Sequence, residues 1–387
     1  MCNNFTNKID SFIAFIRNYY SEKINPIYLH EPRFVGNERK YVIDAIDSTF
    51  VSSVGKYVDK FEEMMKEITG AKYATATVNG TAALHISLVL AGVERDDLVV
   101  TQPLSFIATC NAISYIGAKP VFVDVDLDTL GLCPIKLAEF LKNNCEVRNN
   151  VCYHIQSNKR ISACVPMHTF GFPSKIDEIA NVCAEFNIKL VEDAAESIGS
   201  KYKDKHTGTY GFVGAFSFNG NKTVTSGGGG CVITDDDRIG KLAKHLTTQA
   251  KIPHKWDFAH DYVGYNYRMP NINAALACAQ LEMLERYIII KRDLANQYKV
   301  FFETNEIQFV SEPVNTYSNY WLNSILLSNR EERELFLEYT NNKKIMTRPV
   351  WNLMNKLKMF SNCICSDISN AIYIEDRLVN IPSSVKL

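Results

Sequence analysis

The sequence lacks an excess of either charge. Lys and Arg together number 42 and Asp and Glu together 43, which leaves a formal net charge of -1. Proteins that attract nucleic acid or an anionic membrane through a global positive field carry a strongly basic balance. This composition excludes that class, and we expect neither nucleic acid nor membrane as a partner.

Long apolar runs and paired cysteines are also missing. No stretch is long enough to cross a bilayer, and charged residues interrupt the apolar N-terminal residues that a secretion signal would need. The 11 cysteines are scattered, and although Cys363 and Cys365 are close, no second pair or His cluster completes a zinc site. We therefore expect a cytoplasmic protein with reduced thiols and no metal.

The remaining composition is that of a large soluble protein. It is 46% hydrophobic and 22% charged over 387 residues, which corresponds to two or three domain-sized units. Apolar residues from Phe5 to Tyr20 recur at helical spacing and predict an amphipathic first helix, docked on the body of the protein or on a partner subunit. A second helix is expected from about Glu38.

Strand and helix patterns alternate from residue 73 onward. The expected strands are 73–78, 97–103, 119–126, 161–168, 188–194, 214–219 and 230–236, and the expected helices are 81–92, 106–117 and 175–187. This alternation predicts an α/β fold with a mostly parallel sheet covered on both faces. The less regular segment 142–160 is expected to be a surface insertion.

A long helical pattern from 271 to 303 is expected to bridge to a smaller C-terminal domain. The predicted division of the chain follows from it. Residues 1–35 form an N-terminal helical extension, 36–255 a large domain, and 256–387 the long helix and a small α+β domain.

Residues with chemical potential follow the predicted strands, where ligands bind in open parallel sheets. Gly80 and Thr81 start a helix whose free N–H groups suit an anion, although an ordinary turn with an N-cap gives the same pattern. Phe106 is placed to stack on a planar ring or to pack in the core. Asp193 ends an apolar strand, where an acid either caps a helix or lies beneath a protonated heterocyclic nitrogen.

Lys222 lies between the expected strand 214–219, which contains Ser217, and a run of four glycines. A lysine in a mostly apolar pocket can form a Schiff base, whereas the plain alternative is a solvated lysine in a flexible turn. Glycines after it let the backbone turn away without blocking a bound ring. The four features arrive in order at successive strand ends, which favours a pyridoxal phosphate (PLP) site over the separate plain alternatives.

Six ordered motifs carry a resemblance to a known family. They read NGTAALH, QPLSFIATCNAI, PVFVDVD, VEDAAESIG, GAFSFNGNKTVTSGGGG and GYNYRMPNINAALACAQLE. With them the chain resembles the DegT/StrS family of PLP-dependent sugar-nucleotide aminotransferases from about Pro32 to nearly the end. The resemblance implies a fold type I, aspartate-aminotransferase-like large domain, a small C-terminal domain, a homodimer and PLP or pyridoxamine phosphate as cofactor.

The resemblance assigns roles by position. Lys222 matches the lysine that holds PLP, and Asp193 matches the partner of the pyridine nitrogen. Phe106 matches the aromatic residue that stacks on the ring. The phosphate cradle is matched by Gly80, Thr81 and Ser217, with Asn266 reaching the phosphate of the neighbouring subunit.

Two positions depart from the family pattern. Glu196 stands where the family often has Gln or His near the PLP hydroxyl, which leaves its role open. SGGGG replaces the commoner Gly-Glu-Gly-Gly, so the function of that glutamate is missing here.

Within the family, the N-terminal helix and segments 29–62, 346–357 and 380–384 look most like aminotransferases of legionaminic-acid and bacillosamine pathways. That implies transfer from L-glutamate to C4 of a nucleotide-linked 4-keto-6-deoxy sugar, chiefly UDP-2-acetamido-2,6-dideoxy-4-keto-hexose, with Arg348 and Trp351 helping to hold the sugar nucleotide. The alternatives are a GDP-4-keto-6-deoxymannose (perosamine-type) aminotransferase and a non-catalytic regulator with the same fold. A dehydratase of the family would carry His in place of Lys222.

Overall fold

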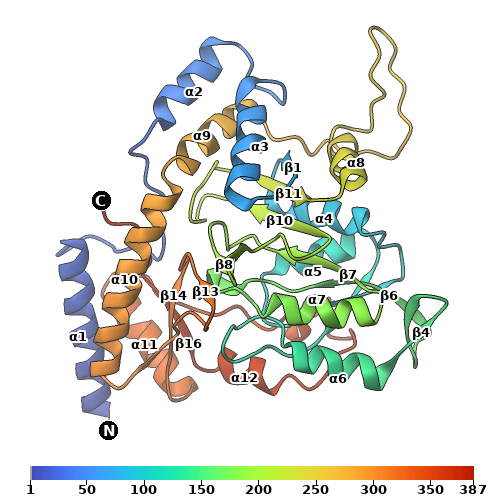
Figure 1. Ribbon diagram of the computed structural model, residues 1–387. Helices are drawn as coiled ribbons and strands as arrows, with labels where there is room; N and C mark the ends of the chain where they lie inside the picture. Colours follow the sequence, from blue (N-terminus) through green and yellow to red (C-terminus); the bar gives the residue numbers. More distant parts are fainter. Residues whose placement is uncertain (1) are drawn as a thin grey trace.

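A nine-stranded sheet runs through the larger part of the protein (Figure 1). The computed structural model describes the backbone of residues 2–387 and the side chains of residues 5–387. The main path of the sheet is β1-β11-β10-β7-β6-β2-β3, and the β4–β5 hairpin joins it at β6. The strands are β1 (Tyr73–Thr77), β2 (Leu98–Thr101), β3 (Lys119–Phe122), β4 (Cys145–Arg148), β5 (Val151–His154), β6 (Lys159–Val165), β7 (Lys189–Asp193), β10 (Val213–Ser217) and β11 (Gly230–Thr234).

Strand direction explains where a site can form. Neighbours along β10-β7-β6-β2-β3 are parallel, and on the main path β11 is the strand that runs antiparallel, between β1 and β10. The carboxyl ends of β1, β2, β6, β7 and β10 therefore lie at one edge of the sheet. All four residues of β2 are buried, as expected for a strand covered on both faces.

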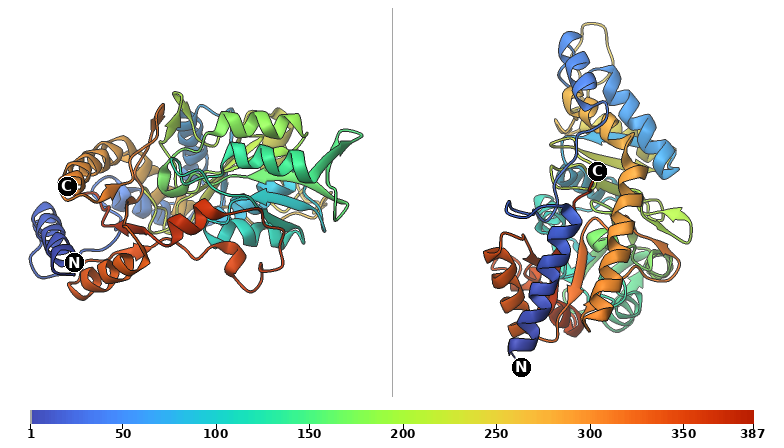
Figure 2. Two further views of the ribbon diagram at one scale, coloured as in Figure 1. Left: turned by 90° about the horizontal axis from the view of Figure 1, so that it is seen from below. Right: turned by 90° about the vertical axis from the view of Figure 1, so that its left-hand side faces the viewer.

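Helices cover both faces of this sheet (Figure 2). Buried side chains of α4, α5 and α8 pack on one face, while those of α6 and α7, and of α3 and α9, form the clusters of the other. The helices are α2 (Glu38–Asp47), α3 (Lys56–Thr69), α4 (Gly80–Leu90), α5 (Ile107–Tyr115), α6 (Pro134–Asn144), α7 (Ile176–Glu185), α8 (Asp237–Thr247) and α9 (Asn271–Leu281). The expected α/β fold with a mostly parallel, doubly covered sheet is confirmed.

The expected single helix over 271–303 is wrong in one respect. It is interrupted after α9 and resumes as α10 (Leu284–Thr304). At the break, Glu282 accepts hydrogen bonds from Asn37, Tyr41 and Lys60, which ties this turn to α2 and α3. The first turns of α10 share a buried cluster with α9 and α3, and the later turns of α10 contribute to the core of the small domain.

The segment 142–160 is more regular than its sequence indicates. It contains the end of α6, the hairpin of β4 and β5, and the start of β6. Antiparallel pairing joins Cys145 to His154 and Tyr153 to Arg160, so the hairpin extends the sheet. In Figure 1 it projects at the right-hand edge of the molecule.

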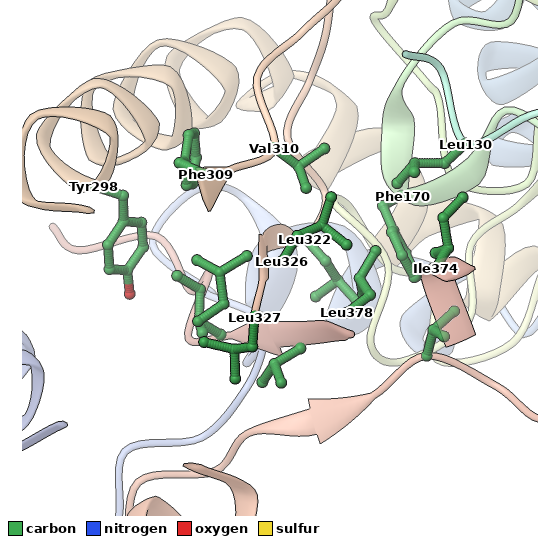
Figure 3. Close-up of a cluster of buried hydrophobic side chains, with 14 of the residues drawn as sticks. Leu130, Phe170, Tyr298, Phe309, Val310, Leu322, Leu326, Leu327, Ile374 and Leu378 are labelled. Carbon is green, nitrogen blue, oxygen red and sulfur yellow. The ribbon is translucent and has the colours of Figure 1, made fainter. Parts of the chain in front are cut away.

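A smaller antiparallel sheet, β12-β14-β16-β15, forms the second core (Figure 3). Around it pack α10, α11, α12 and the N-terminal helix α1 (Cys2–Tyr20), whose existence the apolar spacing predicted. The remaining elements are β8 (Lys201–Tyr202), β9 (Lys205–His206), β12 (Gln308–Phe309), β13 (Thr316–Tyr317), β14 (Asn323–Leu326), β15 (Arg348–Pro349), β16 (Leu378–Ile381), α11 (Arg330–Asn342), α12 (Ser369–Glu375) and the short 3-10 helices η1 (Thr169–Gly171) and η2 (Met354–Lys356). The domain boundaries at 35 and 255 stay predictions.

Candidate active site

A cavity of about 300 Å³ opens at the carboxyl edge of the large sheet. It lies where the strand directions predict a ligand site. Most of the residues singled out from the sequence line it, namely Gly80, Thr81, Phe106, Asp193, Glu196, Ser217, Lys222 and Trp351. The structure therefore brings together residues that are up to 271 positions apart in the chain, from Gly80 to Trp351.

The start of α4 forms one end of the cavity. Asn79 caps the helix by accepting a hydrogen bond from the Ala82 N–H at 2.8 Å, whereas the first-turn amides of Gly80 and Thr81 have no partner within the helix. A Cβ on Gly80 would lie 2.6 Å from the Cβ of Ser217. Glycine is thus required for the close approach of the helix start to the end of β10, where free N–H groups are placed to receive an anion.

Asp193 lies at the end of β7 and is 2% exposed. Its Oδ2 accepts a hydrogen bond from Thr109 Oγ1 at 2.6 Å and its Oδ1 accepts one from the Ala195 N–H at 3.2 Å. Burial raises the pKa of Asp193, and the two hydrogen bonds and the nearby Lys222 oppose that rise. A buried carboxylate held in this way suits a cationic ring nitrogen.

Lys222 reaches into the cavity from the turn after β10. Its Nζ lies 3.0 Å from Glu196 Oε1 and 4.1 Å from the centre of the Trp321 ring. The side chain is 11% exposed, so it is not the solvated lysine of the plain alternative. Sequence reasoning missed Trp321, for which no motif was available, and Thr109, which lies within a quoted motif.

Glu196 is buried directly against Lys222. Its second oxygen, Oε2, accepts a hydrogen bond from the backbone N–H of Phe170 at 2.9 Å. Phe170 has a left-handed backbone with φ 56°, uncommon for a bulky residue. Burial raises the pKa of Glu196 to about 7, although the charge of Lys222 and the hydrogen bonds act in the opposite direction.

Phe106 forms a side of the cavity at the start of α5. It is 46% exposed, which argues against the alternative of a core phenylalanine. Its ring centre lies 5.9 Å from that of Trp351. The two rings stand at the junction with a larger neighbouring cavity.

The larger cavity has a volume of about 1060 Å³. It shares Phe106, Asn221, Trp321 and Trp351 with the smaller one, so the two are adjoining spaces. Arg348 lines only this larger cavity, and its Nη1 donates hydrogen bonds to Asn341 Oδ1 and to Thr347 O, both at 2.9 Å.

Asn266 is not brought to the cavity of its own chain. It is exposed, and its backbone pairs with Thr248 in an antiparallel bridge. Its predicted contact is with a neighbouring subunit, so that role stays a prediction. Of the helices in residues 2–387, none has the length and apolarity needed to cross a membrane.

The residues of the smaller cavity fit PLP. The start of α4 and Ser217 lie close enough to hold a phosphate between them. A Cβ at Gly80 would push Ser217 away from the helix start. Asp193 offers a buried acid, and Lys222 offers an amine within the same space. Together with the sheet order, they define an enzyme of the aspartate-aminotransferase-like fold that uses PLP.

The chain belongs to the DegT/DnrJ/EryC1/StrS aminotransferase family, whose model matches residues 32–387. A GDP-perosamine synthase of Escherichia coli O157:H7 is 37% identical over 339 residues, 88% of each chain. One from Vibrio cholerae is 36% identical over 363 residues, 92% of this chain and 93% of the relative. The chain is therefore a PLP-dependent sugar-nucleotide aminotransferase.

Solved structures agree on the fold. The aminotransferase TlmJ from Streptoalloteichus hindustanus has a TM-score of 0.84 at 23% identity, covering 93% of this chain and 94% of that one. The PLP form of the sugar aminotransferase Spr1654 from Streptococcus pneumoniae has a TM-score of 0.83 at 20% identity, covering 94% of both chains.

The expected subgroup is not supported. The relatives with 37% and 36% identity are GDP-perosamine synthases, not enzymes of legionaminic-acid or bacillosamine pathways. They agree better with the GDP-linked alternative. Their similarity extends over most of both chains, whereas the expected subgroup rested on the N-terminal helix and on segments 29–62, 346–357 and 380–384.

Proposed function

We propose that this enzyme transfers the amino group of L-glutamate to C4 of GDP-4-keto-6-deoxymannose. The choice of a GDP-linked acceptor is supported by the similarity to two GDP-perosamine synthases, at 37% and 36% identity over most of each chain. As part of the same proposal, two copies of the chain form a homodimer with shared sites.

A second acceptor is favoured by a separate observation. The N-terminal helix and segments 29–62, 346–357 and 380–384 resemble enzymes that use UDP-2-acetamido-2,6-dideoxy-4-keto-hexose. Residues 29–32 and several of 346–357 line the larger cavity, so this resemblance concerns a surface that would meet the sugar nucleotide. The two acceptors differ in both nucleotide and sugar C2 substituent, which makes them separable by experiment.

Bound PLP supplies an electron sink for the carbon that carries the amino group. In our proposal, Lys222 holds the cofactor at rest and, once released, moves a proton between the amino acid Cα and the cofactor carbon. Asp193 keeps a proton on the ring nitrogen, because a buried carboxylate stabilises an adjacent cation. Gly80, Thr81 and Ser217 hold the phosphate.

Glu196 gives the released Lys222 a defined place. The pair is 3.0 Å apart and almost fully buried, so a free ammonium is held beside the reacting atoms rather than in solvent. Trp321, 4.1 Å from the same nitrogen, restricts its movement and excludes water from that side. This arrangement favours return of the amine to the same position after each half-reaction.

The larger cavity is the proposed place of the sugar nucleotide. Its volume of about 1060 Å³ compares with about 300 Å³ for the smaller cavity, and a nucleoside diphosphate sugar needs the larger space. The shared residues Phe106, Trp321 and Trp351 place its mouth beside Lys222. A sugar at that mouth would present C4 to the amine while the nucleotide stays outside.

The proposal is tested by following the nitrogen. The enzyme is incubated with ¹⁵N-labelled L-glutamate together with one of the two keto sugars, in a separate reaction for each sugar. The products are examined by mass spectrometry. We expect ¹⁵N in a GDP-linked amino sugar and 2-oxoglutarate in equal amount. Label only in the UDP-linked product would establish the second acceptor, and label in neither, with glutamate consumed, would refute both.

A further inference from the structure

The N-terminal helix precedes the part of the chain that the family model covers. That model begins at residue 32, whereas α1 spans Cys2–Tyr20. Figures 1 and 2 show α1 lying alongside α10 at the outer side of the small domain. Its role therefore has to be found in its own contacts.

The helix is built into the core of the small domain. Phe12 is fully buried, and its ring centre lies 5.3 Å from that of Phe336 and 5.6 Å from that of Phe302. Ile9 and Ile16, on the same face, are fully buried as well. A helix with three such anchors has a fixed position, because moving it would expose all of them.

The end of α1 is fastened at two separate places. Arg17 donates from Nη2 to Lys343 O at 2.6 Å and from Nη1 to Glu22 O at 3.2 Å. Tyr20 donates from its hydroxyl to Ser384 O at 2.8 Å. These bonds fix the turn after the helix to α11 and to the C-terminal segment.

The chain then runs between the same two supports. The Ile27 N–H donates to Lys344 O at 2.9 Å, as part of a parallel bridge from Ile27 to Ile345. On the other side, the Ser383 N–H donates to Leu29 O at 2.7 Å. The extended segment from 27 to 31 is thus held along both edges.

This held segment borders the larger cavity. Five consecutive residues, 28–32, line it. The side chain of Tyr28 is 44% exposed, and among the described side chains it makes no hydrogen bond or ring contact. A flat aromatic ring at a cavity wall without a partner of its own is available to a ligand.

We propose that α1 holds residues 28–32 as one wall of the acceptor site, so that affinity for the nucleotide depends on a helix that does not touch it. The inference rests on the proposed function, because it takes a sugar nucleotide as the occupant of the larger cavity. Tyr28 is the wall residue that contacts the nucleotide, and Arg17 is a positioning residue that acts through the segment between them.

The test measures nucleotide binding and the glutamate half-reaction separately. Binding of GDP and of UDP to the PLP-loaded full chain is measured by calorimetry for wild type, Tyr28→Ala and Arg17→Ala. Lys8→Ala controls for Arg17→Ala, because Lys8 lies on the same helix and, among the side chains of residues 5–387, pairs only with the exposed Glu306. Tyr373→Ala controls for Tyr28→Ala, because Tyr373 has a similar exposure of 40% but does not line the cavity.

We expect the dissociation constant of GDP to rise about tenfold in Tyr28→Ala and in Arg17→Ala and to stay unchanged in both controls. The rate of the glutamate half-reaction should be unchanged in Arg17→Ala and in both controls. GDP binding at the wild-type level in Tyr28→Ala would refute the proposal that residues 28–32 form a wall of the acceptor site. This result decides the question even if Arg17→Ala lowers the folded fraction. If the wild type binds UDP but not GDP, and both variants bind UDP more weakly, the proposed wall is supported and the GDP-linked acceptor is refuted. If the wild type binds neither nucleotide, both the proposed wall and the GDP-linked acceptor are refuted.

Discussion

At the scale of residues, the chemistry depends on a few buried pairs. Lys222 with Glu196, and Asp193 with Thr109, are close contacts between side chains from different parts of the chain. The sequence located Lys222 and Asp193 because they lie in motifs at strand ends. It left the role of Glu196 open and did not indicate Trp321, because that contact depends on how the small domain packs against the turn after β10.

Replacing Glu196 by Gln should change the pH dependence of stability of the PLP-free protein. Burial raises the pKa of Glu196 to about 7, so between about pH 4.5 and 7 the folded state keeps a proton that the unfolded state releases. The stabilisation is complete below that window and is lost as pH rises through it. Relative to wild type, Glu196→Gln should therefore gain on the order of 2–3 kcal/mol in the free energy of unfolding as pH rises across the window.

The measurement is urea unfolding of both proteins at each end of this window. Glu38→Gln is the matched control, because it removes another buried carboxylate that lies outside the cavity. A difference between Glu196→Gln and wild type that does not change with pH would contradict the assigned shift.

Asp193→Asn should keep the fold and lose the first half of the reaction. Asn preserves the shape and can still accept the hydrogen bond from Thr109, but it removes the charge that holds a proton on the ring nitrogen. We expect the glutamate half-reaction, followed by stopped-flow absorbance, to slow by at least about 100-fold. Circular dichroism should match wild type, and near-normal turnover would show that the ring nitrogen has another partner.

At the scale of elements, the junction of α4 and β10 sets the geometry of the cavity. The sequence predicted both elements, because the helix begins at a capping motif and the strand is a short apolar run. It did not predict the break between α9 and α10, where neither Pro nor Gly interrupts the helical pattern. At that break, Glu282 accepts three hydrogen bonds from residues more than 200 positions away, and no local pattern reveals these contacts.

Gly80→Ala should weaken cofactor binding. The added Cβ would lie 2.6 Å from the Cβ of Ser217, so the helix start must move away from β10 and widen the phosphate cradle. We expect the dissociation constant of PLP, measured by fluorescence, to rise about tenfold or more. Gly220→Ala is the control, because its Cβ would meet nothing within 4 Å. Equal PLP affinity in the two variants would contradict the proposal that the helix start at Gly80 and Ser217 hold the phosphate.

At the scale of the whole molecule, the proposal requires two copies of the chain. Large apolar side chains are exposed on the loop 251–264, among them Trp256 at 77% and Phe258 at 76%. This loop ends just before Asn266, the residue expected to reach the neighbouring site. An exposed group of this kind next to a residue with no role in its own cavity favours an interface between copies.

Mixing two defective variants tests the shared site. Lys222→Ala and Asn266→Ala should each have low activity, but a mixed dimer would contain one site with both Lys222 and a partner's intact Asn266. After subunit exchange we expect about a quarter of wild-type activity, because half of the dimers are mixed and each restores one of two sites. Activity no higher than the average of the separate variants would place Asn266 in its own subunit's site or outside any site.

The most direct test of the central claim is a single turnover of the acceptor. Enzyme treated with L-glutamate and then desalted carries the amino group on its cofactor, and the visible absorbance of PLP held by Lys222 is lost. Adding GDP-4-keto-6-deoxymannose should restore that absorbance rapidly, while the UDP-linked acetamido sugar should restore it slowly or not at all. Restoration by the UDP-linked sugar alone, from enzyme that had reacted with glutamate, would contradict the proposed acceptor.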